Sequence, residues 1–461
     1  MKINNILNQL SMDKINLNNE QWKAFKVMED TYENLFITGK AGTGKSALLT
    51  YFLRHTKKDV VVLAPTGVAA LNIGGQTIHS FFGLAPGLQN PEDIEAIHRR
   101  PRGTVEVIKN LDAIIIDEIS MVSSDVMNMI DAKLRFIRGN KMPFGGVHML
   151  VFGDLYQLPP VMTDSDQRRF VLDRFGSEYF FNADALRERP FRMVELSHIF
   201  RQSDAEFIEM LNAIRLGQAD DDVLEALNER CYIDDDDDCI TLTATNAKAN
   251  DVNRARMREL KTPLFKHIGT VTGVMNRSDL PTDVRLELKE GAHIMMVKND
   301  HIVAKDKAKG VQGHGIRWVN GSLGQVSFTD DRHDKVRVKI GRNDYNVDLE
   351  TWEKRQYRYD RQAGKIDGKV VGEFNQFPIK LAYAITIHKA QGQTYDAARI
   401  DMGRGAFSEG QTYVALSRCR SLDRLYLTRP IQADDIIVSE VVNRFMNSGG
   451  TEVPRPSLLF V

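Results

Sequence analysis

The chain has 461 residues, of which 42% are hydrophobic and 27% charged, so its length and composition fit about three folded domains. Its 61 basic and 62 acidic residues give a net charge of −1, so a polyanion would have to be bound by local patches rather than by the field of the whole molecule. The three cysteines have neither metal-ligand spacing nor the density of a disulfide scaffold. No stretch approaches the ~20 apolar residues of a membrane span, and no signal-peptide pattern is present. We therefore expect no membrane partner and a location in a bacterial or viral-host cytoplasm.

The most informative segment, 39–46, fits a phosphate-binding loop at every fixed position. It follows an apolar run at 35–37 and precedes a helical pattern at 47–54, which is the context that such a loop requires. Glycines allow backbone N–H groups to point at phosphate, and the following helix adds the positive end of its dipole. The segment predicts ATP binding, with Lys45 on the outer phosphates and Ser46 on Mg²⁺.

Apolar runs at 35–38, 60–64, 113–116 and 147–152 alternate with helical patterns. This alternation predicts a parallel sheet with helices on both faces. Segment 83–109 contains three prolines and a cluster of arginines, and we expect a small irregular insertion with a basic tip there.

The strand predicted at 113–116 ends in Asp117 and Glu118. Phosphoryl transfer needs a carboxylate near Mg²⁺ and a group that handles the nucleophile, and these two acids could supply both. Taken singly, such a pair is usually a strand end meeting solvent. Segment 153–160 closes the next strand and contains Gln157, which could sense the terminal phosphate; a capped turn is the alternative.

The second half predicts another α/β unit, with an acidic helical stretch at 204–230 and a solvated loop at Asp234–Asp238. Its strands are expected at four apolar runs, 240–245, 293–297, 382–386 and 425–428. Segment 300–374 is polar, with short alternating runs, and predicts an inserted β module. Within it, 352–361 interleaves aromatic and basic residues, for which a strand pair with one solvated side is a more frequent explanation than a nucleic-acid face.

Taken together, these segments resemble superfamily 1 helicases and, among them, the Pif1 family, over residues 17 to about 428. The matching segments are 17–21, 39–46, 64–70, 77–82, 116–121, 153–161, 196–202, 242–246, 384–394 and the surroundings of Arg418. The most family-specific piece is 131–138 with 143–147, which resembles the Pif1 signature. The long N-terminal extension of eukaryotic members has no counterpart in this sequence.

The resemblance implies an α/β fold with two RecA-like parallel-sheet domains in tandem and ATP in the cleft between them. The first would span 1–200, with a small wedge insertion at 83–109. The second would combine 201–299 and 375–461, with an SH3-like insertion at 300–374. The resemblance also implies a monomeric helicase of superfamily 1B, from a bacterium or a virus. Such a helicase would move 5′ to 3′ on single-stranded DNA and open duplex junctions, and its further substrates would be G-quadruplexes and DNA–RNA hybrids. Nothing in the residue spacing fixes the direction.

Roles at the ATP site follow from the resemblance by position within each motif. Adenine would be read by Gln21, and the phosphates would be held by Gly42, Thr43, Gly44, Lys45 and Ser46. Mg²⁺ would be bound by Ser46 and Asp117, and Glu118 would activate the attacking water. The γ-phosphate would be stabilised by Gln157, Arg201 and Arg418, and Gly392 would line the cleft. Arginines suit this role because phosphoryl transfer spreads negative charge over the transferred group.

Single-stranded nucleic acid is usually held through backbone phosphates, with aromatic side chains stacking on bases. By resemblance, the strand channel is lined by Pro65, Thr66, Thr77, His79 and Phe81 in the first half and by Thr245, Asn246, Thr386, His388 and Lys389 in the second. For a lone threonine, helix capping is the more frequent role. His79 and Phe81 are the strongest candidates for base contact.

Two other functions remain open at this point. The chain could be the motor subunit of a recombination nuclease similar to RecD, although the segment 143–146 argues against this. It could also be a DNA-stimulated ATPase that displaces proteins and unwinds little. A non-catalytic binding module is disfavoured because the residues of the ATP site are all present in the sequence.

Overall fold

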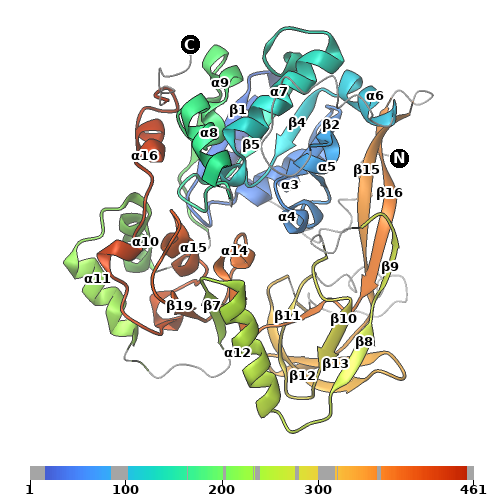
Figure 1. Cartoon of the computed structure of the whole chain (residues 1–461), viewed down its shortest axis with the longest axis vertical. Helices are drawn as coiled ribbons and strands as arrows, with labels where there is room; N and C mark the ends of the chain where they lie inside the picture. The colour runs from blue at the N-terminus through green and yellow to red at the C-terminus, as the bar shows by residue number, and fades with distance from the viewer. Residues whose placement is uncertain are drawn as a thin grey trace.

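The computed structural model places two parallel sheets in one chain, with a mostly antiparallel β region joined to the second (Figure 1). This arrangement confirms the predicted α/β class. The described residues are 16–84, 102–162, 165–200, 204–231, 233, 239–275, 280–298, 317–318, 320–360 and 365–453.

The first sheet has six parallel strands in the order β3-β2-β4-β5-β1-β6. Their bounds are β1 Leu35–Gly39, β2 Val60–Ala64, β3 Gln76–Thr77, β4 Ala113–Ile116, β5 His148–Phe152 and β6 Arg192–Leu196. The four predicted strands are confirmed, and each is buried along its whole length because helices cover both faces of the sheet. Alternate side chains face opposite layers: Phe36 belongs to one hydrophobic cluster, and Leu35 and Ile37 belong to another.

The helices of the first half follow the strands in the alternating order that the sequence predicts. They are α2 Asn19–Asp30, α3 Lys45–His55, α4 Gly67–Asn72, α5 Ile78–Phe82, α6 Arg102–Asn110, α7 Ser124–Arg138, α8 Ser165–Phe175 and α9 Asp184–Glu188, with 3₁₀ turns η2 Ile119–Met121, η3 Pro143–Gly146 and η4 Phe180–Asn182. The irregular structure expected for 83–109 is wrong for its last part. Here α6 buries Val107 and Ile108 in the core and packs against α7, while 85–101 lies outside the described residues.

The segment 131–147 is held together by its own side chains. Asp131 accepts a hydrogen bond from the backbone N–H of Phe144 at 2.5 Å and pairs with Arg135 at 2.8 Å. Arg138 donates from Nε to the carbonyl of Gly145 and from Nη1 to that of Ile108, at 3.0 and 2.8 Å. These bonds fasten the end of α7 to η3 and to the last turn of α6, so this family-specific segment has a structural role in this chain.

The second parallel sheet has four strands in the order β18-β7-β19-β20. They are β7 Ile240–Thr243, β18 Ala384–Thr386, β19 Ala398–Asp401 and β20 Leu425–Leu427, and β19 was not predicted. The accompanying helices are α10 Ala205–Leu216, α11 Asp221–Asn228, α12 Asn246–Glu259, α14 Ile387–Ala390, α15 Gln411–Leu416 and α16 Glu440–Asn447, with turns η5 Glu229–Cys231, η7 Leu422–Arg424 and η8 Ala433–Asp435. The acidic helical stretch is therefore confirmed as α10 and α11, while 234–238 lies outside the described residues.

The β region is wider than the expected module at 300–374. Its strands are β8 Phe265–Ile268, β9 Thr270–Gly273, β10 Arg285–Leu288, β11 His293–Met296, β12 Leu323–Asp330, β13 Lys335–Ile340, β14 Asn343–Val347, β15 Glu350–Asp360, β16 Lys365–Gln376 and β17 Ile379–Leu381. The assignment of 293–297 to the second parallel sheet is wrong, because β11 pairs antiparallel with β12 and β17. The strand pair expected at 352–361 is confirmed: β15 pairs with β16, and this long hairpin reaches α6 of the first half (Figure 1).

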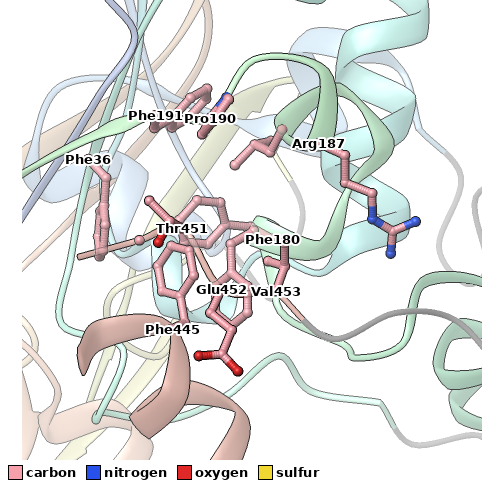
Figure 2. Close-up of a pocket in the computed structure, with 12 residues that line it drawn as sticks. Phe36, Phe180, Arg187, Pro190, Phe191, Phe445, Thr451, Glu452 and Val453 are labelled. Atoms are coloured by element: carbon pink, nitrogen blue, oxygen red, sulfur yellow. The ribbon is translucent and has the colours of Figure 1, made fainter. Parts of the chain in front are cut away.

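The end of the described chain returns to the first half. Phe445 of α16 stacks on Phe181 of η4 with ring centroids 3.9 Å apart and planes 5° apart. The same aromatic layer borders a cavity of about 540 Å³ near Phe36, with Arg187 and Glu452 among its lining residues (Figure 2). The second half is thus anchored on the first by apolar packing as well as by the site between them.

Candidate nucleotide and nucleic-acid site

The loop between β1 and α3 has the backbone geometry of a phosphate cradle. Gly42 and Gly44 have φ values of 85° and 80°, which favour glycine, and an added Cβ at Gly44 would lie 2.4 Å from the Nε2 atom of Gln21. Lys45 donates from Nζ to the carbonyls of Gly39 and Lys40 at 2.6 and 3.0 Å, so its ammonium lies across the mouth of the loop. Burial lowers the pKa of Lys45, although Asp154 and Glu118 oppose this effect.

Gln21, the expected adenine contact, supports this loop directly. Its Nε2 donates to the carbonyls of Thr43 and Gly44 at 3.4 and 3.3 Å. Its Oε1 accepts from the backbone N–H of Asn18 while Asn18 caps the backbone N–H of Gln21, which completes a capping box at the start of α2. The loop is also held by Phe200, whose N–H donates to the carbonyl of Gly42 at 2.9 Å. Recognition of adenine by Gln21 stays a prediction.

The two acids after β4 lie beside the lysine of the loop. Burial, followed by the neighbouring Glu118 carboxylate, raises the pKa of Asp117 to about 7. Burial also raises the pKa of Glu118, and Lys45 and Arg418 oppose that rise. Glu118 has φ 52° and ψ 48°, a left-handed conformation that a non-glycine residue adopts at a cost of about 1–3 kcal/mol. The backbone therefore holds Glu118 in an unusual orientation, as often occurs at functional sites.

The donor set suits Mg²⁺. This ion prefers oxygen ligands and commonly binds one or two protein groups together with substrate phosphates. Ser46 lies in the first turn of α3, next to Lys45, and the Asp117 carboxylate interacts electrostatically with Lys45. Within the described residues there is no cluster of three or more His, Cys, Asp and Glu side chains suited to a metal. A site that is completed by phosphate is the kind that these residues can form.

Three residues of the second half lie near Glu118. Gln391, just after α14, donates from Nε2 to Oε2 of Glu118 at 2.9 Å and to Oε1 of Gln157 at 3.2 Å. Gly392 has φ 77°, and a Cβ there would lie 3.5 Å from Oε1 of Glu118. Arg418 is 1% exposed and donates to the carbonyls of Val414, Ala390 and Gln393. Arg418 thus fixes the loop that carries Gln391.

Of the residues predicted for the ATP site, the structure brings six close together: Lys45, Asp117, Glu118, Gln157, Gly392 and Arg418. Arg201 lies outside the described residues, next to Phe200. Contact of Gln157, Arg201 and Arg418 with a γ-phosphate stays a prediction.

A buried network at this site escaped the sequence analysis. Asp154, just after β5, pairs with Arg215 of α10 at 3.0 Å and accepts a hydrogen bond from the hydroxyl of Tyr413 at 3.2 Å. The same hydroxyl accepts from the N–H of Ala41 in the phosphate loop at 3.0 Å. Although burial alone would raise the pKa of Asp154, Arg215 and Lys45 hold it below its ordinary value. Asp154 and Tyr413 lie inside matched motifs, whereas Arg215 lies in a plain amphipathic helix and carried no signal.

The predicted DNA residues of the first half lie at or just after the ends of β2 and β3, which are neighbours in the sheet. Thr66 accepts a hydrogen bond from the N–H of Ala69 in α4, and Thr77 caps α5 through the N–H of Ser80. Pro65 and His79 are half-buried, and burial lowers the pKa of His79. Thr66 and Thr77 therefore cap helices, which was the alternative to a DNA-contacting role. Their position at the carboxyl edge of the sheet is nevertheless the one expected for a ligand surface.

Phe81 does not have the position expected of a base contact. It is 1% exposed and packs edge-to-face on Phe82, with ring centroids 4.9 Å apart, inside the core of the first half. A buried ring cannot stack on a base, so in this structure Phe81 is a packing residue.

In the second half, the predicted DNA residues lie at or just after the ends of β7 and β18, which also pair with each other. Thr245 caps α12 and Thr386 caps α14. Asn246 and Lys389 are exposed, and His388 is half-buried with a pKa that burial lowers. Both parallel sheets thus present their predicted groups at carboxyl ends of neighbouring strands.

Comparison with known proteins places this arrangement in a family. The family model described as PIF1-like helicase matches residues 16–225. The ATP-dependent DNA helicase PIF1 of Rattus norvegicus is 35% identical over 402 residues, which are 85% of this chain and 58% of that protein. The chain therefore spans less than two thirds of that relative. The ATP-dependent DNA helicase Pif1 of Bdellovibrio bacteriovorus is 32% identical over 91% of this chain and 89% of its own length.

Among solved structures, Bacteroides sp Pif1 in complex with ADP-AlF4 matches with a TM-score of 0.84 and 34% identity, over 94% of this chain and 97% of that one. Bacteroides Pif1 bound to ssDNA matches over the same shares, at 34% identity, with a TM-score of 0.65. Within the described residues, no helix is long and apolar enough to cross a membrane.

Proposed function

Because this chain belongs to the PIF1-like helicase family, we propose that it is an ATP-dependent DNA helicase whose ATP site lies between its two parallel sheets. One observation carries the proposal. Glu118 of the first half accepts a hydrogen bond from Gln391 of the second half at 2.9 Å, and the N–H of Ala41 in the phosphate loop donates to the hydroxyl of Tyr413, also of the second half, at 3.0 Å. A site assembled from both halves allows nucleotide binding and hydrolysis to change how the halves are held.

Hydrolysis would use groups that are already oriented. Lys45 and the N–H groups of the loop bind the phosphates, and Glu118 accepts a proton from the attacking water as its oxygen bonds to the γ-phosphorus and the bond to the bridging oxygen of ADP breaks. The raised pKa of Glu118 makes it a stronger base than an ordinary carboxylate while Lys45 and Arg418 favour its ionised form. Gln157, Arg201 and Arg418 would stabilise the charge on the transferred group.

We propose Mg²⁺ as the metal, held by Ser46 and Asp117 together with the phosphates. When bound, it would supply positive charge that offsets the negative charge of the phosphate oxygens.

Single-stranded DNA would cross the carboxyl edges of both sheets. Its phosphates would meet the groups near Thr66, His79, Thr245 and α14, which lie just after neighbouring strands of each sheet. Relative movement of the two halves during an ATP cycle would then move the strand stepwise. Translocation from 5′ to 3′, unwinding of duplex junctions, action on G-quadruplexes and DNA–RNA hybrids, and a monomeric state are parts of this proposal that rest on the family resemblance.

The ATP site is tested with two substitutions. Lys45→Ala should abolish ATP turnover, because the phosphates lose their main cation. Glu118→Gln should leave nucleotide affinity within about threefold while lowering kcat at least ~100-fold, because only the proton acceptor is lost. Steady-state ATPase assays with and without oligo(dT), beside equilibrium binding of a fluorescent ATP analogue, measure both. Turnover near the wild-type rate in either variant would contradict the site assignment.

A further inference from the structure

We propose that Gln391 is a positioning residue that holds the Glu118 carboxylate and makes its orientation depend on the predicted DNA-binding helix α14. This inference rests on the proposed function and concerns the same site. Its starting point is one amide nitrogen that bonds two residues of the other half of the chain, Glu118 at 2.9 Å and Gln157 at 3.2 Å.

The chemistry fixes which way the amide points. A primary amide nitrogen has two hydrogens, so both bonds form at once and use its full donor capacity. The reverse orientation would place the Oε1 atom of Gln391 against a carboxylate, which is repulsive. In the observed orientation Oε1 is buried and has no hydrogen-bond partner within the part of the chain that the structure describes. A buried acceptor beside the carboxylate of Glu118 is a suitable partner for a proton of the attacking water, because such atoms are costly to leave unpaired.

The same bonds orient the two partners. Glu118 has one oxygen bonded to Gln391, and an added Cβ at Gly392 would lie 3.5 Å from the other, so the carboxylate is held by the amide on one side and faces a residue without a side chain on the other. Gln157 turns its acceptor oxygen to Gln391, and the amide nitrogen that remains is a donor, which is the polarity that a phosphate oxygen requires.

The link to DNA follows from position along the chain. Gln391 is the residue at which α14 ends, and Thr386 caps the start of that helix. Only four residues separate the two, and they include the predicted DNA contacts His388 and Lys389. Arg418 ties this loop to α15 by donating to the carbonyls of Ala390 and Gln393 at 3.4 and 3.1 Å. A shift of α14 on binding a strand would therefore be passed to Glu118 through the Gln391 amide.

The test compares two neighbouring glutamines. Gln391→Met keeps the length of the side chain but removes both donors. Gln393→Ala is the matched control, because Gln393 lies in the same loop and bonds Tyr395 rather than the acids. Rates of ATP hydrolysis are measured with and without dT20, together with the affinity for dT20 and for a fluorescent ADP analogue, and Lys45→Ala serves as the blank.

We expect Gln391→Met to lower kcat with dT20 about 10- to 100-fold, to lower the rate without DNA less, and to change KM and both affinities by less than about threefold. Gln393→Ala should remain within about twofold of the wild type in all measurements. If the wild type hydrolyses ATP and the Gln391→Met variant is equally active, this inference alone is overturned. The same holds if the variant loses the same share of its ATP hydrolysis rate with and without DNA. A wild type that hydrolyses no ATP would overturn the proposed function as well.

Discussion

At the scale of single residues, Asp117 gives the site a dependence on pH. Its pKa is raised from 3.8 to about 7, first by burial and then by Glu118, so between these values the folded state binds more protons than the unfolded state. The free energy of unfolding should therefore fall as pH rises from about 4 to 7. At ~1.4 kcal/mol per pH unit the effect has a ceiling of about 4 kcal/mol, and partial solvent exposure reduces it.

Urea denaturation at a series of pH values, in EDTA and without nucleotide, measures this slope. In the Asp117→Asn variant, whose side chain cannot ionise, the free energy of unfolding should fall less as pH rises. At pH 8 this variant should be more stable than the wild type. Parallel curves for the two proteins would show that Asp117 has no such shift.

His79 and Phe81 are two residues apart but have different roles in the structure. His79→Ala should weaken binding of single-stranded DNA with little change in stability or in ATP hydrolysis without DNA, because the ring is half-buried at the edge of the sheet. Phe81→Ala should lower the free energy of unfolding by about 3 kcal/mol or more, because it removes a ring from the core. Chemical denaturation and fluorescence anisotropy with dT20 separate the two effects. A fully stable Phe81→Ala protein with weakened DNA affinity would restore the base contact that the sequence predicted.

At the scale of elements, the start of α2 supports the phosphate loop. Asn18→Ala removes one half of the capping box that holds Gln21, so we expect the free energy of unfolding to fall by about 1 kcal/mol. Because Gln21 also bonds the carbonyls of Thr43 and Gly44, affinity for ADP should fall as well. Calorimetric titration with ADP provides the measurement. Exposed Lys23→Ala on the same helix is the control, and equal affinities for the two variants would contradict a role of the cap in the loop.

The elements also show what the sequence could and could not predict. β1, β2, β4 and β5 were predictable because a strand covered on both faces is a continuous apolar run. The edge strand β6 is mostly exposed or half-buried and lacks such a run. β11 has an apolar run, but its antiparallel partners lie far along the chain, so pattern alone assigned it to the wrong sheet.

The same reasoning applies to the site. Lys45, Asp117 and Glu118 stand in motifs whose chemistry is readable in order along the chain. The Asp154–Arg215 pair and the contact of Gln391 with Glu118 depend on how the two halves meet, which no local pattern encodes.

At the scale of the whole molecule, the two halves are joined by a buried polar network and by apolar packing. Tyr413 links the phosphate loop to Asp154, and Arg215 pairs with the same carboxylate. On the other side, Phe445 packs on Phe181 beside the aromatic cavity. These contacts join the phosphate loop, the second half and α16. Gln391 at the end of α14 also bonds Glu118, so a change at the ATP site has a physical route to a helix proposed to hold DNA.

The most direct test of this account is unwinding of two duplexes that differ only in the polarity of a single-stranded tail. The account predicts ATP-dependent strand separation with the 5′ tail and none with the 3′ tail, and Lys45→Ala should be inactive on both. Separation with the 3′ tail alone would contradict the proposed direction. DNA-stimulated ATP hydrolysis without separation of either duplex would contradict the helicase assignment and favour an ATPase that displaces proteins.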